Sequence, residues 1–226
     1  MNFSITLILA LLSSANVSTE EKSAWYLPIN VVSRQSLENV RLTAIGEFGR
    51  LRQARARVPA HLHTAIDVMR PRNNYIDEPI FPVALGVVIS LCTDGPFAQI
   101  IIEHREAEET VAWTVYEHIA GVQVSIGDTV SPFNPIGRFF NHNELDKYGR
   151  QFNHLHFEVL KMKPHRLQPN AKTPLRFYQP YSLECFNQDD LEKHYHHPLE
   201  FFKSRWQASK LKVDEKTERL YQLEGN

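Results

Sequence analysis

The amino-acid sequence predicts a mainly β protein, built as an antiparallel sheet or sandwich with long loops and a short helical segment near the C-terminus. Two observations favour this fold class. From Pro79 to His156, short runs rich in β-branched and aromatic residues alternate with turn residues. No helix-length amphipathic segment occurs before Asp189, so the chain lacks the alternation of strands and helices that is typical of parallel α/β folds. With 226 residues, of which 42% are hydrophobic, the chain is long enough to bury a core.

The N-terminal end has the features of a secretory signal. An apolar run from Ile5 to Leu12 precedes the small residues Ser13, Ser14 and Ala15, which predicts a signal peptide over residues 1–15, although no Lys or Arg precedes the run. The run is too short to span a bilayer, so we expect no stable membrane insertion. We therefore expect a periplasmic or secreted protein, in which residues 16–41 lead into one domain over residues 42–202.

The middle and end of the chain divide into strands, loops and a tail. Three strands are expected at Val83–Cys92, Ala98–His104 and Val111–Ile119, with turn residues between them. Residues 139–150 have the composition of an extended loop, and residues 163–197 form a second insertion rich in proline. The segment 189–206 predicts a short helix interrupted at a proline, and the charged residues 203–226 predict a mobile tail or a solvated helix.

Charge and cysteine content narrow the functional classes. The formal net charge of −1 gives no electrostatic case for a nucleic-acid partner. Two cysteines, Cys92 and Cys185, exclude a disulfide-dense scaffold and a zinc site built on several thiolates. In an oxidising compartment the two could pair, and two free thiols are an equally good interpretation. Eleven histidines are the more informative feature, because histidine is the commonest metal ligand.

One histidine pair lies on a strand with a clear apolar face. Because side chains alternate along a strand, Leu155, Phe157 and Val159 point one way, while His154, His156 and Glu158 point the other. The strand therefore directs two imidazoles and a carboxylate to one side. Glu158 is either a hydrogen-bond partner of an imidazole or a simple contact at the strand edge.

An earlier segment supplies a third histidine and an aspartate. In an extended chain His63, Ala65 and Asp67 share one face, and the small Ala65 leaves room for both ligands to reach one ion. Two histidines and one carboxylate are a typical catalytic zinc set, with a fourth position left for water. A surface pair of His63 and Asp67 is the alternative interpretation.

A fourth histidine, His118, lies near the end of the strand Val111–Ile119, where alternation places it on the same face as Tyr116. A single strand histidine is more often structural than catalytic, so His118 gains weight only if it meets the other two segments. Tyr116 either donates a hydrogen bond into that cleft or only packs.

Taken in order, these motifs resemble those of the lysostaphin-type zinc endopeptidases, also called LytM-domain peptidases. The order is His63-x-x-x-Asp67, then Tyr116-x-His118, then His154-x-His156. Other segments agree with the family's strands and turns, namely Pro82–Val88, Ile101–His104, Val124–Gly137 and Pro198–Phe202. The resemblance covers roughly residues 42–202, and the ordered set is specific where each motif alone is not.

The resemblance implies a role for each residue of the set. His63, Asp67 and His156 would bind one Zn²⁺, and His118 and His154 would be catalytic histidines that do not bind it. One imidazole would move the proton of a zinc-activated water, and the other would hold the oxyanion. We assign the first role to His154. The implied function is a secreted endopeptidase that hydrolyses cross-links or stem peptides of peptidoglycan.

Two features of the chain depart from the family pattern. Ala65 stands where the family usually has glycine, which would be costly if that position required a positive φ. The insertions at 139–150 and 163–197 are longer than a compact domain needs and could line or cover the groove. The alternative function is therefore a catalytically inactive module that binds the wall or regulates a hydrolase. Four arginines before His63, at positions 50, 52, 55 and 57, are interpreted as a solvated loop, with attraction of wall-peptide carboxylates as the alternative.

Overall fold

The computed structural model describes residues 24–106 and 109–224, with side chains up to Leu211. The predicted signal peptide at 1–15 lies outside the described residues. Every strand pair in the described part of the chain is antiparallel, so the predicted fold class is confirmed. No helix in the described part is both long enough and apolar enough to cross a membrane.

The main sheet has seven strands, and β11 (His154–Leu160) lies near one edge of it. On one side β11 pairs with β7 (Glu109–Glu117). On the other side it pairs with β3 (Ile66–Met69) along its first half and with β14 (Tyr195–His196) at its end. The sheet continues from β7 through β6 (Gln99–Glu106) and β5 (Gly86–Cys92) to β9 (Thr129–Val130). The strands predicted around 83–92, 98–104 and 111–119 correspond to β5, β6 and β7.

Three smaller sheets complete the β structure. The first has three strands, β4 (Pro79–Ile80), β10 (Gly137–Phe139) and β8 (Ile119–Ala120), in that order. Two short hairpins are formed by β1 (Leu51–Arg52) with β2 (His61–Leu62), and by β12 (His165–Arg166) with β13 (Tyr178–Gln179).

The two faces of the main sheet bury different clusters. On one face Leu155, Phe157 and Val159 join the largest core, together with residues of the three-stranded sheet and with Phe201 and Phe202. Trp25, Leu27 and Ile29 belong to the same core, so the described part of the N-terminal lead-in packs on the domain. The opposite face packs against the insertion after β11 through Tyr181, Cys185 and Leu191. This second face also carries His154, His156 and Glu158, and we call it the site face.

Residues 139–150 are not an extended loop, which corrects the prediction. They contain helix α1 (His142–Tyr148), followed by a short 3₁₀ turn over Arg150–Phe152. Asn141 accepts a hydrogen bond from the Glu144 amide, and the Glu144 carboxylate accepts one from the Asn141 amide. This capping box stabilises a helix of only seven residues.

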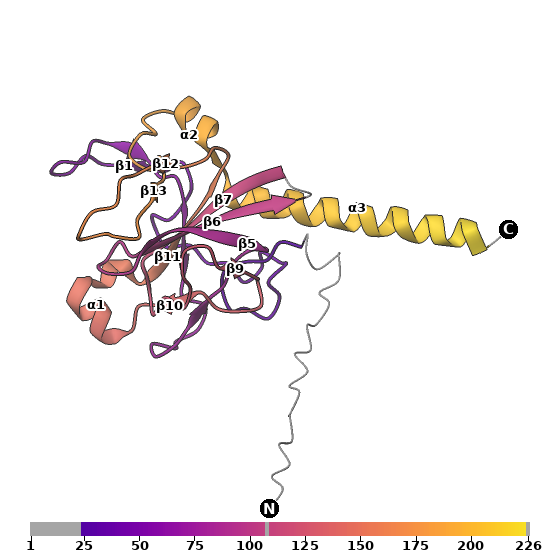
Figure 1. Cartoon of the computed structure of the whole chain (residues 1–226), viewed down its shortest axis with the longest axis horizontal. Helices are drawn as coiled ribbons and strands as arrows, with labels where there is room; N and C mark the ends of the chain where they lie inside the picture. The colour runs from indigo at the N-terminus through magenta and orange to yellow at the C-terminus, as the bar shows by residue number, and fades with distance from the viewer. Residues whose placement is uncertain (1–23, 107–108, 225–226) are drawn as a thin grey trace, which may run out of the picture.

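The C-terminal segment forms two helices with a strand between them, not one interrupted helix. Helix α2 (Gln188–His194) is followed by β14, and α3 (Pro198–Glu224) then begins at the proline. Proline suits the first position of a helix, because its missing N–H would have no partner there. Helix α3 starts against the core and then extends away from the domain (Figure 1). The tail predicted at 203–226 is therefore helical up to Glu224.

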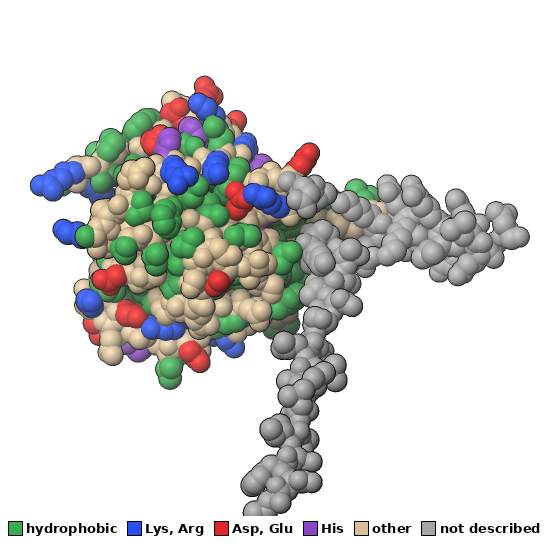
Figure 2. Space-filling model, in the orientation of Figure 1, with side chains coloured by type: hydrophobic (Ala, Val, Ile, Leu, Met, Phe, Trp, Pro, Cys, Tyr) green, Lys and Arg blue, Asp and Glu red, His purple; other side chains and the backbone are tan. Residues whose placement is uncertain are grey.

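Neither of the two cysteines forms a disulfide. Cys92 and Cys185 are both free thiols, and Cys185 is buried. Burial raises the pKa of Cys185 to about 12, so this thiol stays protonated. On the face of the molecule in Figure 2, Lys and Arg side chains are interspersed with Asp and Glu around a central apolar and neutral area.

Candidate metal centre

Strand pairing brings the predicted ligands together from distant parts of the sequence. Strand β3 lies beside β11 so that Asp67 is directly opposite His156. His63 follows β2 and is buried with Asp67. The three side chains form the one group of potential metal ligands found among the described residues.

The ligand atoms form a compact triangle. His63 Nε2 lies 3.1 Å from Asp67 Oδ1 and 3.3 Å from His156 Nδ1, and His156 Nδ1 lies 3.0 Å from Asp67 Oδ1. Tetrahedral zinc with bonds of about 2.0–2.1 Å separates its ligand atoms by about 3.3 Å. The spacing of the three atoms therefore fits a zinc ion.

The hydrogen bonds of the two imidazoles leave a lone pair on the nitrogen of each ring that faces the triangle. His63 Nδ1 donates to the carbonyl oxygen of Glu47 at 2.9 Å, which leaves the lone pair on Nε2. His156 Nε2 lies 3.2 Å from Glu158 Oε1, and donation to this carboxylate leaves the lone pair on Nδ1. Second hydrogen bonds of this kind fix the tautomer of metal-binding histidines. Two lone pairs and a carboxylate oxygen then converge, and such a donor set fits a cation.

The pKa directions agree with a site for positive charge. Burial alone would raise the pKa of Asp67, but its contacts with the imidazoles of His154, His156 and His63 outweigh it and hold the pKa well below its usual range. Burial alone would lower the pKa of His156, yet the carboxylates of Asp67 and Glu158 raise it well above the ordinary value. A proton on His156 and a metal ion therefore compete for the same position, so metal affinity falls as pH falls.

Glu158 lies directly behind His156, which agrees with its interpretation as a hydrogen-bond partner of an imidazole. It is fully buried, and Oε1 also accepts hydrogen bonds from Thr64 Oγ1 at 2.6 Å and Ser182 Oγ at 2.8 Å. Ser182 comes from the insertion at 163–197, so part of this insertion supports the candidate metal site from behind.

The two remaining histidines lie beside the triangle. His154 Nε2 is 3.4 Å from Asp67 Oδ1, and the rings of His118 and His154 are 4.9 Å apart between centroids. His118 Nδ1 donates to the carbonyl oxygen of Pro96 at 2.6 Å, which leaves the lone pair on Nε2. Burial, with the charges of His156 and His154, lowers the pKa of His118 to about 3 and keeps this imidazole neutral.

The backbone at His118 departs from the predicted strand. Its φ is +64°, a left-handed conformation that costs a non-glycine residue about 1–3 kcal/mol. This break separates β7 from β8 and turns His118 onto the site face. Tyr116 lies on the opposite face, fully buried in the main core, where its hydroxyl accepts a hydrogen bond from the Val83 amide at 2.9 Å. The prediction that both residues share a face is wrong, and Tyr116 packs in the core.

Two further residues touch the site and were not predicted. Arg52 donates to Asp67 Oδ2 at 2.7 Å, so one of the four arginines forms a specific ion pair instead of a solvated loop. Glu117 is directly opposite His156 on the site face, with Oε1 4.0 Å from His118 Nε2 and Oε2 accepting from Gln99 at 2.8 Å. Alternation along β7 could have placed Glu117 on its face, but only the register with β11 places it beside His156.

Ala65 is compatible with the backbone at its position. Among the described residues other than glycine, only Arg57 and His118 have a positive φ, so Ala65 is not in the left-handed region. Its methyl group is fully buried. The replacement of the family's glycine therefore imposes no backbone strain.

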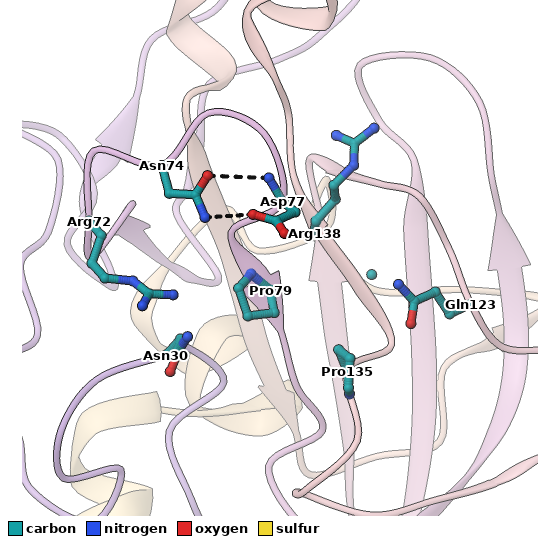
Figure 3. A pocket seen from close by; sticks show the side chains of 9 residues that line it. Asn30, Arg72, Asn74, Asp77, Pro79, Gln123, Pro135 and Arg138 are labelled. Carbon is teal, nitrogen blue, oxygen red and sulfur yellow. Dashed lines mark hydrogen bonds between the residues drawn. The ribbon is translucent and has the colours of Figure 1, made fainter.

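A separate hollow of about 520 Å³ lies over the three-stranded sheet (Figure 3). Its two guanidinium groups are already paired, Arg72 with Glu78 and Arg138 with Glu144. No predicted site residue lines it; its lining consists of Asn30, Arg72, Asn74, Asp77, Pro79, Gln123, Pro135, Gly137 and Arg138. His194 and His196 do not belong to the triangle either. His194 Nδ1 donates to the Asp190 carbonyl, and His196 packs on Phe201.

The sheet presents two imidazole nitrogens and a carboxylate oxygen, with two further histidines beside them. This arrangement is expected of a metal-dependent hydrolase. The model of peptidase family M23 matches residues 61–169. Residues 61–169 are therefore similar to this peptidase family, and the resemblance to the lysostaphin-type peptidases is confirmed.

Solved structures similar to this chain include three peptidase structures. A zinc-containing peptidase from Vibrio cholerae is 23% identical, with 60% of this chain and 36% of that chain covered and a TM-score of 0.41. Lysostaphin from Staphylococcus simulans is 17% identical, with 75% and 52% covered and a TM-score of 0.43. The catalytic domain of the M23 protein EnpA from Enterococcus faecalis is 18% identical, with 61% and 88% covered and a TM-score of 0.40. The chain thus spans about a third of the Vibrio protein and half of lysostaphin, and no curated protein sequence matches it.

Proposed function

We propose that the protein is a secreted or periplasmic zinc endopeptidase that hydrolyses cross-links or stem peptides of bacterial peptidoglycan. The observation that carries the proposal is the triangle of His63 Nε2, Asp67 Oδ1 and His156 Nδ1, with distances of 3.0–3.3 Å. These residues would hold the ion. Bound zinc would supply a Lewis acid that polarises the scissile carbonyl and lowers the pKa of a water molecule.

The chain's own residues divide the proton chemistry between them. His118 is neutral and presents a lone pair at Nε2, because Nδ1 donates to Pro96 O. It therefore accepts the proton of the attacking water at Nε2, and the nearby Glu117 carboxylate stabilises the imidazolium that results. His154 faces Asp67 through Nε2 and donates its N–H toward negative charge that develops on the substrate oxygen. This assignment reverses the base role first given to His154.

The test combines metal content with cleavage. Purified protein is expected to bind one zinc ion per chain and to release peptide fragments from purified sacculi in a chelator-sensitive way. His156→Ala should lose both properties, whereas His118→Asn should keep the zinc and lose cleavage. The exposed His165 lies outside the site, so His165→Ala serves as the matched control and should retain both. Metal-free wild-type protein without cleavage would refute the proposal.

The inactive alternative has less support, because the complete ligand set converges and Ala65 carries no backbone strain. The same assay decides between the two: a chain that binds sacculi without releasing fragments would be such a module.

A further inference from the structure

Two aromatic side chains form an apolar surface beside the catalytic histidine, outside the metal site. Phe97 lies 5.8 Å from the His118 ring between centroids, and Phe152 lies 4.8 Å from it. The two phenyl rings are 5.6 Å apart in an edge-to-face arrangement. Phe97 is 55% exposed although it is large and apolar. We propose that Phe97 and Phe152 form a subsite that binds an apolar side chain of the peptide substrate next to the scissile bond, which rests on the proposed function.

The surface is held rigidly relative to the reacting groups. Phe97 directly follows Pro96, whose carbonyl oxygen accepts the hydrogen bond from His118 Nδ1. Phe152 precedes His154 by two residues, at the end of the 3₁₀ turn. A side chain seated on the two rings is therefore placed at a fixed position relative to both histidines.

Helix α1 supports Phe152 from behind. Phe152 packs against a small buried cluster that contains Phe140 and Leu145, and Tyr148 packs against the same cluster. Tyr148 Oη also donates to Asp94 Oδ1 at 3.1 Å, which ties α1 to the loop that carries Phe97. The insertion at 139–150 thus supports Phe152 by packing and is hydrogen-bonded to the loop that carries Phe97.

The chemistry of the surface defines the occupant. Two phenyl rings bind aliphatic and aromatic groups through burial of apolar surface and ring packing. Glycine has no side chain to make these contacts. Because the surface adjoins His118, the residue that reaches it is one that flanks the bond being hydrolysed. The subsite therefore favours substrates with an apolar side chain over Gly–Gly bonds.

The experiment uses zinc-loaded protein and two series of defined peptides. The first series varies the residue on the N-terminal side of the scissile bond, and the second varies the residue on its C-terminal side. The varied residue is Gly, Ala, Leu or Phe. In one series kcat/KM should rise from Gly to Leu by about tenfold or more, as for other apolar pockets. Phe97→Ala should reduce the Leu-to-Gly ratio toward one, and Phe97→Leu should restore part of it. Calorimetric titration with the same peptides tests the preference where cleavage is too slow to measure.

Phe133, which is 52% exposed and packs edge-to-face on Tyr26, provides the matched control. Phe133→Ala should leave the ratio unchanged. Zinc content and thermal unfolding are measured for every variant, so that loss of folding is not mistaken for loss of preference. Equal cleavage and binding of Gly and Leu peptides by the wild type, or an unchanged ratio in Phe97→Ala, would overturn the subsite. Absence of cleavage of sacculi and of every peptide would instead count against the proposed function.

Discussion

The buried imidazole of His104 should make the stability of the protein strongly dependent on pH. His104 is 1% exposed, with Nδ1 donating to the Leu85 carbonyl at 2.9 Å and Nε2 accepting from Thr114 Oγ1 at 2.7 Å. Burial lowers the pKa of His104 to about 4. In the unfolded chain the pKa of histidine is about 6.5. Between these two pH values the imidazole is protonated in the unfolded chain but stays neutral in the folded protein.

The magnitude follows from the two pKa values. Stability is unaffected above pH 7 and falls as the pH drops from 6.5 toward 4, by about 3 kcal/mol in total and about 2 kcal/mol by pH 5. This is a large part of the stability of a typical domain, about 5–15 kcal/mol. His104→Asn keeps a donor toward Leu85 O but has no group that titrates in this range.

Urea unfolding at pH 7.5, 6.5, 5.5 and 5.0 measures the effect. The variant should be less stable than the wild type at pH 7.5, and the difference should shrink by about 2 kcal/mol by pH 5. Contributions from the other histidines and from metal release cancel, because both proteins share them. The exposed His165→Asn is the control and should follow the wild type. Parallel pH curves for the wild type and His104→Asn would refute the reasoning.

Three further substitutions test other parts of the structure. Glu158→Gln should weaken zinc binding about 10–100-fold in chelator competition, because the carboxylate behind His156 is lost, and the exposed Glu184→Gln should not. Ala65→Gly should lower stability to urea by about 0.5–1 kcal/mol without increasing cleavage, since Ala65 has no positive φ to relieve; a faster enzyme would contradict this. Asn141→Ala should cost about 1 kcal/mol and speed hydrogen exchange within α1 while β11 stays protected, whereas a uniform change along the chain would argue against a local cap.

The sequence predicted most accurately the parts of the molecule that obey a simple period. Alternation along 154–159 placed His154, His156 and Glu158 on one face and the core residues on the other, as the structure has them. The same rule failed at His118, because its left-handed backbone interrupts the alternation and no residue type there announces it.

Other features depend on register or on local signals. The capping pair Asn141 and Glu144 was visible in the sequence and could have identified α1. The contacts of Arg52 with Asp67 and of Glu117 with the site required the pairing of separate strands, which a single sequence does not supply.

The sequence separation of the three proposed metal ligands has a mechanical consequence. Asp67 and His63 precede His156 by 89 and 93 positions, so an ion bound by all three would act as a cross-link that closes a long loop of chain. Joining distant residues in this way removes conformations from the unfolded state and raises stability without adding any packing. Metal loading would then set the lifetime of the protein as well as its chemistry, and chelation would expose the chain to proteolysis.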